Sequence, residues 1–284
     1  MAKRMVITLS QKGGVGKTAW LCSLIQALRH KGVACEAYDA DGANSSLSRT
    51  LGQTDPNPAT GCRKYDLSSP AERNLLVVSA RDAADGSVIC HDLGGGALAD
   101  LRVVGGDDGK RQSASGFLNC LEECNTLLTV VHLMSPFKET QASAAAICKE
   151  IPQGRADHLF VLPEWYETGT LKDFPFWGGY DSETGRVGGK LREKMLGAGA
   201  REIFFPKLRP VILAKLSAES VAIPVGKTLK ELNLGKEIHG LGSLDFGEIG
   251  SLATWSEHFL GEIEQAADLL GYPATTTPDL EDEI

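Results

Sequence analysis

Residues 5–19 read MVITLSQKGGVGKTA, an apolar run followed by a loop in which three glycines lie between Lys12 and Lys17. A glycine loop between a strand and a helix turns several backbone N–H groups toward one point, and the positive end of the helix dipole adds to them. This pattern predicts a phosphate-binding loop. Lys17 is expected to neutralise the terminal phosphates and the Thr18 hydroxyl to hold Mg²⁺.

The rest of the chain alternates between strand-like and helix-like segments, which predicts an α/β fold. The sheet is expected to be mostly parallel, with helices on both faces. The expected strands are 5–9, 33–41, 74–80, 87–93, 126–134, 158–163 and 202–206, and 221–225 is a further short apolar run. The expected helices are 18–32, 113–124, 138–151, 209–220 and 252–271.

No internal repeat or convincing boundary divides the sequence, so residues 1–273 are predicted to form a single domain that contains the phosphate-binding loop. The polar tail 274–284 is acidic and is predicted to be disordered. Residues 53–74, 104–116 and 164–190 are expected to be loops or insertions. The last of these is rich in aromatic residues and is either a partner-binding surface or a hydrophobic lid packed on the body.

Composition excludes several classes of protein. The net charge of −8 argues against a protein that is basic all over, and no apolar stretch reaches the roughly 18 residues of a membrane span. The N-terminus is interpreted as a first strand rather than a signal peptide. Seven cysteines, mostly within apolar segments, indicate reduced thiols and a cytoplasmic protein. Cys120 and Cys124, one helical turn apart, are interpreted as a half-buried face rather than a ligand pair.

The loop departs from the general pattern G-x-x-x-x-G-K-[ST], because Gln11 stands where the first glycine belongs. It fits x-K-G-G-x-G-K-[ST] and so resembles the deviant Walker motif of the ParA/MinD family of ATPases. The resemblance covers most of residues 4–228. It implies that ATP and Mg²⁺ are the cofactors and that Lys12 reaches across a homodimer to the partner's nucleotide. The nucleotide-binding residues that it implies are Gln11, Lys12, Gly13, Gly14, Val15, Gly16, Lys17, Thr18 and Ala19.

Carboxylates follow two predicted strands, at the sheet edge where ligands of parallel sheets bind. The resemblance implies that Asp41 orients the attacking water, that Asp39 lies near Mg²⁺, and that Asp92 is the Walker B residue. The segment after Asp41 is one residue shorter than is usual in the family, and the turn Gly94–Gly96 lacks the family's proline. Asp41 and Asn44 as simple turn or helix caps are the alternative. His91 is expected to face the core.

A strand, a proline and a helix follow near residue 206 and resemble the family segment that packs against adenine. Phe205, Pro206 and Lys207 are therefore expected base contacts. Catalysis is assigned to Lys12, Lys17 and Asp41, and the metal ligands are expected to be Thr18, Asp39 and Asp92.

The distribution of charge predicts what such an ATPase would bind. Residues 186–215 contain eight basic and two acidic residues, and the expected DNA-binding residues are Lys190, Arg192, Lys194, Arg201, Lys207, Arg209 and Lys215. The chain is most similar to ParA-type partition ATPases without an N-terminal helix-turn-helix domain. The acidic C-terminal residues disfavour membrane binding of the MinD kind, and the presence of Lys12 disfavours a dethiobiotin-synthetase-like enzyme.

The resemblance therefore implies a bacterial, nucleoid-associated ATPase that positions a plasmid, a chromosome or another cargo. A partner protein of the ParB or adaptor type is expected to stimulate hydrolysis. The alternatives are a metabolic, metal-handling or electron-transferring enzyme on the same fold, and a MinD-like positioning protein.

Overall fold

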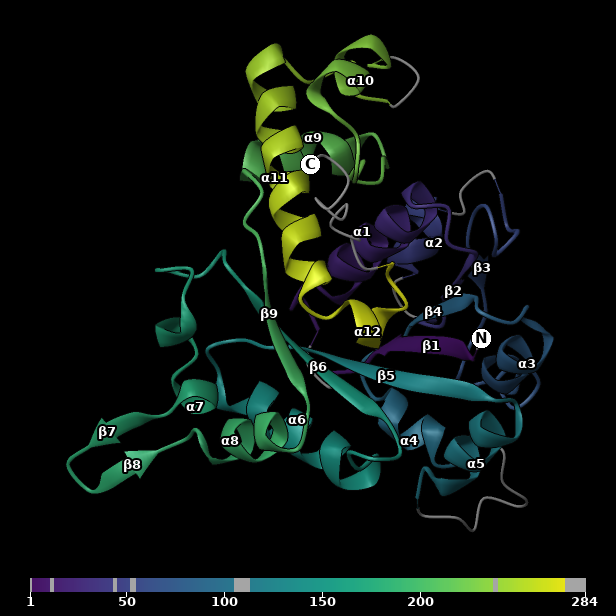
Figure 1. The fold of residues 1–284 in the computed structure, drawn as a ribbon, viewed down its shortest axis with the longest axis vertical. Helices are drawn as coiled ribbons and strands as arrows, with labels where there is room; N and C mark the ends of the chain where they lie inside the picture. Colours follow the sequence, from purple (N-terminus) through teal and green to yellow (C-terminus); the bar gives the residue numbers. More distant parts are fainter. Residues whose placement is uncertain are drawn as a thin grey trace, which may run out of the picture.

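The computed structural model describes residues 2–10, 13–42, 45–51, 55–104, 113–236 and 240–273. Within them, seven strands form one parallel sheet in the order β3-β2-β4-β1-β5-β6-β9 (Figure 1). The strands of the sheet are β1 (Lys3–Thr8), β2 (Cys35–Asp39), β3 (Arg63–Lys64), β4 (Val88–Asp92), β5 (Thr126–Leu133), β6 (Asp157–Pro163) and β9 (Arg201–Phe205). A separate antiparallel hairpin joins β7 (Tyr180–Ser182) to β8 (Gly185–Val187).

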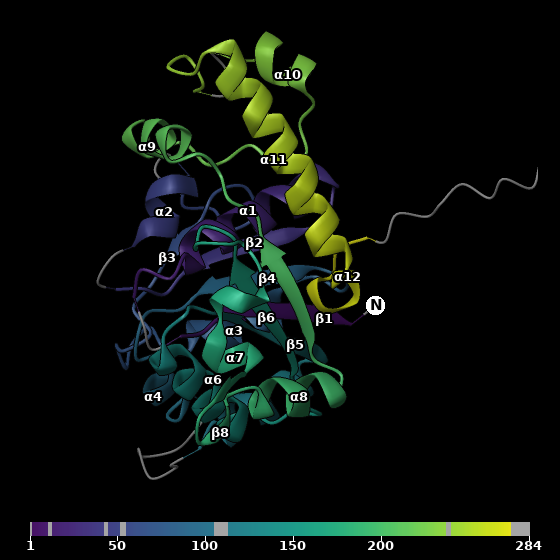
Figure 2. The ribbon, with the colours of Figure 1, turned by 90° about the vertical axis from the view of Figure 1, so that its left-hand side faces the viewer.

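Helices cover both faces of the sheet, as Figures 1 and 2 show, which confirms the predicted architecture. The α-helices are α1 (Lys17–His30), α2 (Ser46–Leu51), α3 (Leu75–Asp82), α4 (Ala97–Leu101), α5 (Ser115–Glu123), α6 (Lys138–Glu150), α7 (Pro175–Gly178), α8 (Lys190–Gly197), α9 (Pro210–Ala218), α10 (Leu229–Leu234), α11 (Phe246–Glu264) and α12 (Ala267–Leu270). A 3₁₀ turn, η1, spans Leu171–Asp173.

Each face of the sheet has its own apolar core because side chains alternate along every strand. Val131 and Leu133 of β5 pack with α1 and α11 on one face, whereas Leu128 and Val130 pack with α3 and α5 on the other. Parallel strands that are buried on both faces are continuously apolar. The run 126–134 was predicted to be such a strand on this ground, and β5 confirms it.

The prediction of a strand at 74–80 is wrong, because Leu75–Asp82 form helix α3. A short apolar run fits either element, and here the i, i+3, i+4 spacing of Leu76, Ser79 and Ala80 places all three against the sheet. Both edges of β4 are already paired, with β1 and β2, so no position for another strand exists beside it.

The C-terminal helix differs from its expected limits at both ends. Helix α11 begins at Phe246, where Asp245 and Glu248 form a capping box, and it ends at Glu264 before the short helix α12. The capping signal D-x-x-E is present in the sequence, but glycines at 247 and 250 obscure it.

The aromatic segment 164–190 is more ordered than the predicted loop, since it contains η1, α7 and the β7–β8 hairpin. Phe174 and Trp177 are fully buried and pack with Phe160 of β6. These two residues form part of the body of the protein. Tyr180, on the hairpin, is 42% exposed.

The predicted disordered tail 274–284 lies outside the described residues. No disulfide bond joins any of the seven cysteines, all of which lie in the described ranges, and Cys120 and Cys124 are half-buried. Within the described residues, no helix combines the length and the apolar character that a membrane crossing requires.

Candidate nucleotide site

Three polar side chains lie in one row across the carboxyl ends of adjacent strands. The strand register pairs Thr8 of β1 with Asp92 of β4, and Asp92 with Asp39 of β2. The loop 9–16 follows β1 directly and leads into α1. The order of the strands therefore brings the glycine loop and two acids to the same point of the sheet edge, where parallel sheets bind ligands.

Asp92 is hydrogen-bonded from two sides. The Thr8 hydroxyl donates to Asp92 Oδ1 at 2.7 Å, and the Thr18 hydroxyl, in the first turn of α1, donates to Asp92 Oδ2 at 2.5 Å. The side chains predicted to hold Mg²⁺ from the loop and from β4 are thus in direct contact. Hydroxyl and carboxylate oxygens are the hard donors that Mg²⁺ prefers.

Burial raises the pKa of Asp92 to about 6, although the hydrogen bonds from Thr18 and Thr8 lower it. The nearby Asp39 carboxylate raises that pKa further, and Lys17 lowers it. A buried carboxylate of this kind is costly to ionise without a cation nearby. The arrangement suits the binding of a divalent cation beside Asp92.

Asp39 is fully buried at the end of β2, and burial raises its pKa. Its carboxylate accepts hydrogen bonds from the backbone N–H of Ser48 at 2.7 Å and of Asp41 at 3.1 Å. Asp39 therefore fixes the loop after β2 and the start of α2 in addition to lying beside Asp92.

Asp41 lies against the turn that follows β4. A Cβ atom placed on Gly94 would be 3.2 Å from Asp41 Oδ1, so the glycine leaves room for this carboxylate. The residue predicted to orient the attacking water thus lies against the turn Gly94–Gly96. Asn44, the alternative cap, lies outside the described residues.

In the glycine loop, Gly14 and Gly16 have φ angles of 74° and 90°, a region that residues with a Cβ rarely adopt. Val15 is buried, whereas Lys17 and Thr18 are partly exposed. Gly16 precedes α1 and has no side chain that would cap the helix, which leaves its first backbone N–H groups for an anion. Gln11 and Lys12 lie outside the described residues.

An apolar cavity of about 320 Å³ opens beside this loop. It is lined by Gly14, Gly16, Ala19, Trp165, Phe205, Pro206, Leu208, Leu213, Ile223 and Trp255. Two of the expected base contacts, Phe205 and Pro206, are therefore in its wall. Phe205 is largely buried in an aromatic group, 5.4 Å from the Trp165 ring and 6.1 Å from the Trp255 ring.

Trp165 was missed as a candidate for the nucleotide site. Its indole covers Gly16, because a Cβ on that glycine would be 2.6 Å from the ring. Trp165 lies two residues beyond the end of β6, and this position at a carboxyl strand end was the available signal. Lys207 is exposed and lines an adjoining hollow with Glu164 and Arg209.

His91 is buried as expected. Its ring nitrogens lie 2.9 Å from the Tyr65 hydroxyl and 3.0 Å from the Ser79 hydroxyl, and burial lowers its pKa to about 3. His91 is therefore a neutral core residue that ties α3 to β4.

The seven basic residues predicted to bind DNA are close together in sequence but are separated in space. Helices α8 and α9 lie at opposite ends of β9 (Figure 1). Three of the seven are in ion pairs: Arg192 with Glu202 at 2.8 Å, Lys215 with Glu248 at 2.7 Å and Arg201 with Asp268 at 3.6 Å. The other four are exposed: Lys190, Lys194, Lys207 and Arg209.

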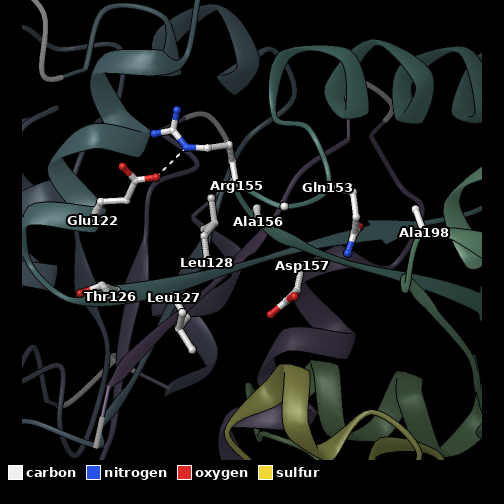
Figure 3. Close-up of a pocket in the computed structure, with 10 residues that line it drawn as sticks. Glu122, Thr126, Leu127, Leu128, Gln153, Arg155, Ala156, Asp157 and Ala198 are labelled. Atoms are coloured by element: carbon white, nitrogen blue, oxygen red, sulfur yellow. Dashed lines mark ion pairs between the residues drawn. The ribbon is translucent and has the colours of Figure 1, made fainter.

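Another hollow, of about 490 Å³, lies at the amino ends of β5 and β6, away from the glycine loop (Figure 3). Its charged side chains pair with one another or with neighbours, Arg155 with Glu122 at 2.6 Å and Asp157 with Arg4 at 2.7 Å. Ligands of parallel sheets bind at the opposite edge, so this hollow is not the candidate nucleotide site.

Comparison with a solved structure, that of a MinD protein, supports the fold. The septum site-determining protein MinD from Pyrococcus horikoshii, complexed with Mg-ADP, aligns over 96% of this chain and 100% of its own, with a TM-score of 0.50 and 14% identity. A putative plasmid partition protein from Borrelia burgdorferi, bound to AMPPNP, aligns over 88% of this chain and 98% of its own, with a TM-score of 0.45 and 12% identity. No protein with a curated description matches the sequence.

The sequence itself matches one family over nearly its whole length. Residues 6–269 match the family described as CobQ/CobB/MinD/ParA nucleotide binding domain. This range contains the glycine loop, the row of Thr8, Asp92 and Asp39, and the apolar cavity. The chain belongs to the CobQ/CobB/MinD/ParA family of nucleotide-binding domains.

Proposed function

We propose that this protein is a Mg-ATP-dependent switch that dimerises around ATP and positions a cargo on DNA. The observation that carries the ATPase part is the contact between Thr18 and Asp92 at the start of α1. It joins the glycine loop to the buried acid of β4 at the sheet edge where a phosphate chain fits.

In this proposal the backbone N–H groups of the glycine loop and the Lys17 ammonium hold the phosphates. The oxygens of Thr18 and Asp92, with Asp39 behind them, hold Mg²⁺, which neutralises phosphate charge when it is bound. Asp41, against Gly94, orients the attacking water. The base occupies the apolar cavity beside Trp165, Phe205 and Pro206, with Lys207 at its outer side.

Lys12 is proposed to act on the nucleotide of the partner subunit, as the family resemblance implies. A positive charge supplied in trans stabilises the charge that develops on the transferring phosphoryl group. Hydrolysis then depends on dimerisation, and each ATP holds the dimer together until it is cleaved.

Non-specific DNA binding is proposed to use Lys207 and Arg209, which are exposed at the carboxyl end of β9. This is the edge that carries the glycine loop, so an ATP dimer joined across it brings two such pairs together. Two weak binding sites for DNA phosphates on one rigid dimer bind DNA much more tightly than either site does alone. A ParB-type or adaptor partner would stimulate hydrolysis and couple the switch to its cargo.

The experiment compares the wild type with Lys17→Ala and Lys12→Ala by nucleotide-binding titration and by light scattering with ATP. We expect Lys17→Ala to lose tight ATP binding, and Lys12→Ala to bind ATP while failing to dimerise and hydrolyse it. Lys172→Ala, at an exposed lysine of η1, is the matched control.

Unchanged ATP affinity in Lys17→Ala would refute the phosphate-binding assignment. A fully active Lys12→Ala would refute the action in trans and leave the phosphate site standing. Turnover that requires an added small-molecule substrate would favour a metabolic enzyme on the same fold.

A further inference from the structure

A cluster of three potential ligands lies between the sheet and α6, outside the nucleotide site. His132 belongs to β5, His158 to the neighbouring strand β6, and Cys148 to α6. Their ligand atoms all lie within 4.8 Å of one another. The shortest separations are 2.8 Å from His132 Nε2 to His158 Nδ1 and 3.7 Å from Cys148 Sγ to His158 Nδ1.

The hydrogen bonds of His158 leave one lone pair directed into the cluster. His158 Nε2 lies 2.9 Å from the Ile151 carbonyl oxygen, which can only accept, so this nitrogen carries the proton. His158 Nδ1 therefore has a lone pair that faces His132 and Cys148. A histidine whose outer N–H donates to a backbone carbonyl has the usual second contact of a metal ligand.

The hydrogen bonding of His132 is incomplete. Its Nε2 donates to His158, whereas its buried Nδ1 has no hydrogen-bond partner among the described residues. A charged His132 ring would leave a second N–H buried without an acceptor, so this geometry favours the neutral ring. A neutral imidazole is the form that binds metals.

The surroundings of the cluster are apolar. The His132 ring stacks on Phe160 at 4.7 Å, and Phe160 packs on Trp177 at 4.2 Å. His132 and His158 are 2% and 0% exposed, and Cys148 is half-buried. No further histidine, cysteine or acid joins the three ligands in the part of the chain that the structure describes.

The charge and the number of the three ligands indicate which kind of metal ion fits the cluster. A structural Zn²⁺ site takes four ligands, and a catalytic one keeps a position open to water, but this cluster offers three ligands, of which the two histidines are buried. One thiolate and two neutral imidazoles neutralise a monovalent ion, whereas a divalent ion would leave a buried net positive charge. Lys194, whose charge acts on Cys148, would oppose that extra charge. Thiolate ligands favour soft ions.

We propose that His132, Cys148 and His158 form a binding site for one soft monovalent metal ion, with Cu(I) as the matching ion. Around Zn²⁺, ligand nitrogens lie about 2.0 Å and a thiolate sulfur about 2.3 Å from the metal. With bond lengths of this size, donors around the bound ion are at most about 4.3 Å apart. The cluster needs only small side-chain movements to reach this arrangement.

Binding conserves charge and protons without a redox step. Cys148 gives up its thiol proton to solvent, and the proton on His132 Nε2 moves to Nδ1, the nitrogen without a partner. One proton is released for each Cu(I) that is bound. The bound ion would tie α6 to β5 and β6 in place of the hydrogen bond between the histidines.

The test titrates the full chain with Cu(I) under anaerobic conditions against a chromogenic Cu(I) chelator, in the wild type and in Cys148→Ser. We expect the wild type to withhold one Cu(I) per chain, and Cys148→Ser to lose more than about 100-fold in affinity, since even second contacts of metal ligands are worth about 10- to 100-fold. The test needs no nucleotide, so its result is independent of the proposed ATPase.

Cys120→Ser, which changes another half-buried thiol, and His258→Gln, at an exposed histidine, are the matched controls and should retain the ion. His158→Gln provides a second variant, and circular dichroism establishes that each variant is folded. Failure of the wild type to withhold Cu(I), or equal retention by Cys148→Ser, would overturn the proposal. Tight binding of Zn²⁺ in preference to Cu(I) would overturn the choice of a monovalent ion.

Discussion

Thr18 and Asp92 are 74 positions apart in sequence, and their side chains are joined by a hydrogen bond of 2.5 Å. One residue comes from the first turn of α1 and the other from the end of β4. The contact exists because β1, which leads into the glycine loop, pairs with β4 in a register that aligns Thr8 with Asp92.

Replacing Asp92 with Asn should stabilise the nucleotide-free protein at pH 7. The pKa of Asp92 is raised from 3.8 to about 6, so the folded protein binds this proton more tightly than the unfolded chain. The stability that results is fully present below about pH 4 and is lost as the pH rises through about 6. At 1.36 kcal/mol per unit, Asp92→Asn should gain up to about 3 kcal/mol at pH 7.

Urea unfolding at several pH values measures this difference. The gain should vanish as the pH falls below 3.8, because Asp92 then becomes protonated in the unfolded chain as well as in the folded protein. Contributions of other groups cancel in the comparison with the wild type. The same variant should lose Mg²⁺-dependent ATP hydrolysis. A gain that does not change with pH would contradict the assigned titration of Asp92.

Replacing Trp165 with Ala should weaken ATP binding. The indole covers Gly16 and forms a wall of the apolar cavity, and stacking of a base on an aromatic ring is worth about 1–3 kcal/mol. The expected loss in affinity is about 5- to 150-fold, measured by titration calorimetry. Trp165→Phe should retain most of the affinity.

Inorganic triphosphate provides the internal control, because it lacks a base. Its affinity should be the same for the wild type and for Trp165→Ala. An equal loss for ATP and triphosphate would mean that the variant disturbs the glycine loop rather than the base cavity.

Replacing Asp41 with Ala should stop hydrolysis and leave ATP binding intact, so that the ATP dimer persists. Gly94→Ala should slow turnover as well, because the added Cβ would lie 3.2 Å from Asp41 Oδ1 and displace the carboxylate. Phosphate release and light scattering measure the two effects. Hydrolysis by Asp41→Ala at the wild-type rate would show that another residue positions the water.

The exposed and the paired cations should behave differently in DNA binding. Lys207→Ala and Arg209→Ala should each weaken the salt dependence of binding to a random-sequence duplex. The slope of the logarithm of the binding constant against the logarithm of the salt concentration should fall by about one unit in each variant. Arg192→Ala should instead destabilise the fold by about 1–3 kcal/mol, because it leaves Glu202 partly buried without its ion pair.

Binding to duplex DNA at several salt concentrations, with ATP, with ADP and without nucleotide, tests the first expectation, and thermal unfolding tests the second. An absence of DNA binding in every nucleotide state would refute the DNA part of the proposed function. A full loss of DNA binding in a stably folded Arg192→Ala would contradict the structural role of that ion pair.

The sequence alone predicted a phosphate-binding loop and acids at the sheet edge, because each prediction depends only on the local order of residues. Glycines at fixed spacing before a helix form the loop, and acids that end apolar runs fall at the carboxyl edge of a parallel sheet. The same local pattern was insufficient for α3, since a short apolar run fits a strand or a helix until its neighbours are known.

Only the tertiary structure decided which distant residues meet. It placed Trp165 over Gly16, separated the basic residues of α8 and α9 to opposite ends of β9, and brought Cys148 to two histidines of adjacent strands. None of these contacts has a sequence signature, because each depends on strand order and helix packing. Local spacing therefore determined the chemistry of the loop, and the packing of the sheet and its helices determined the surroundings of that loop.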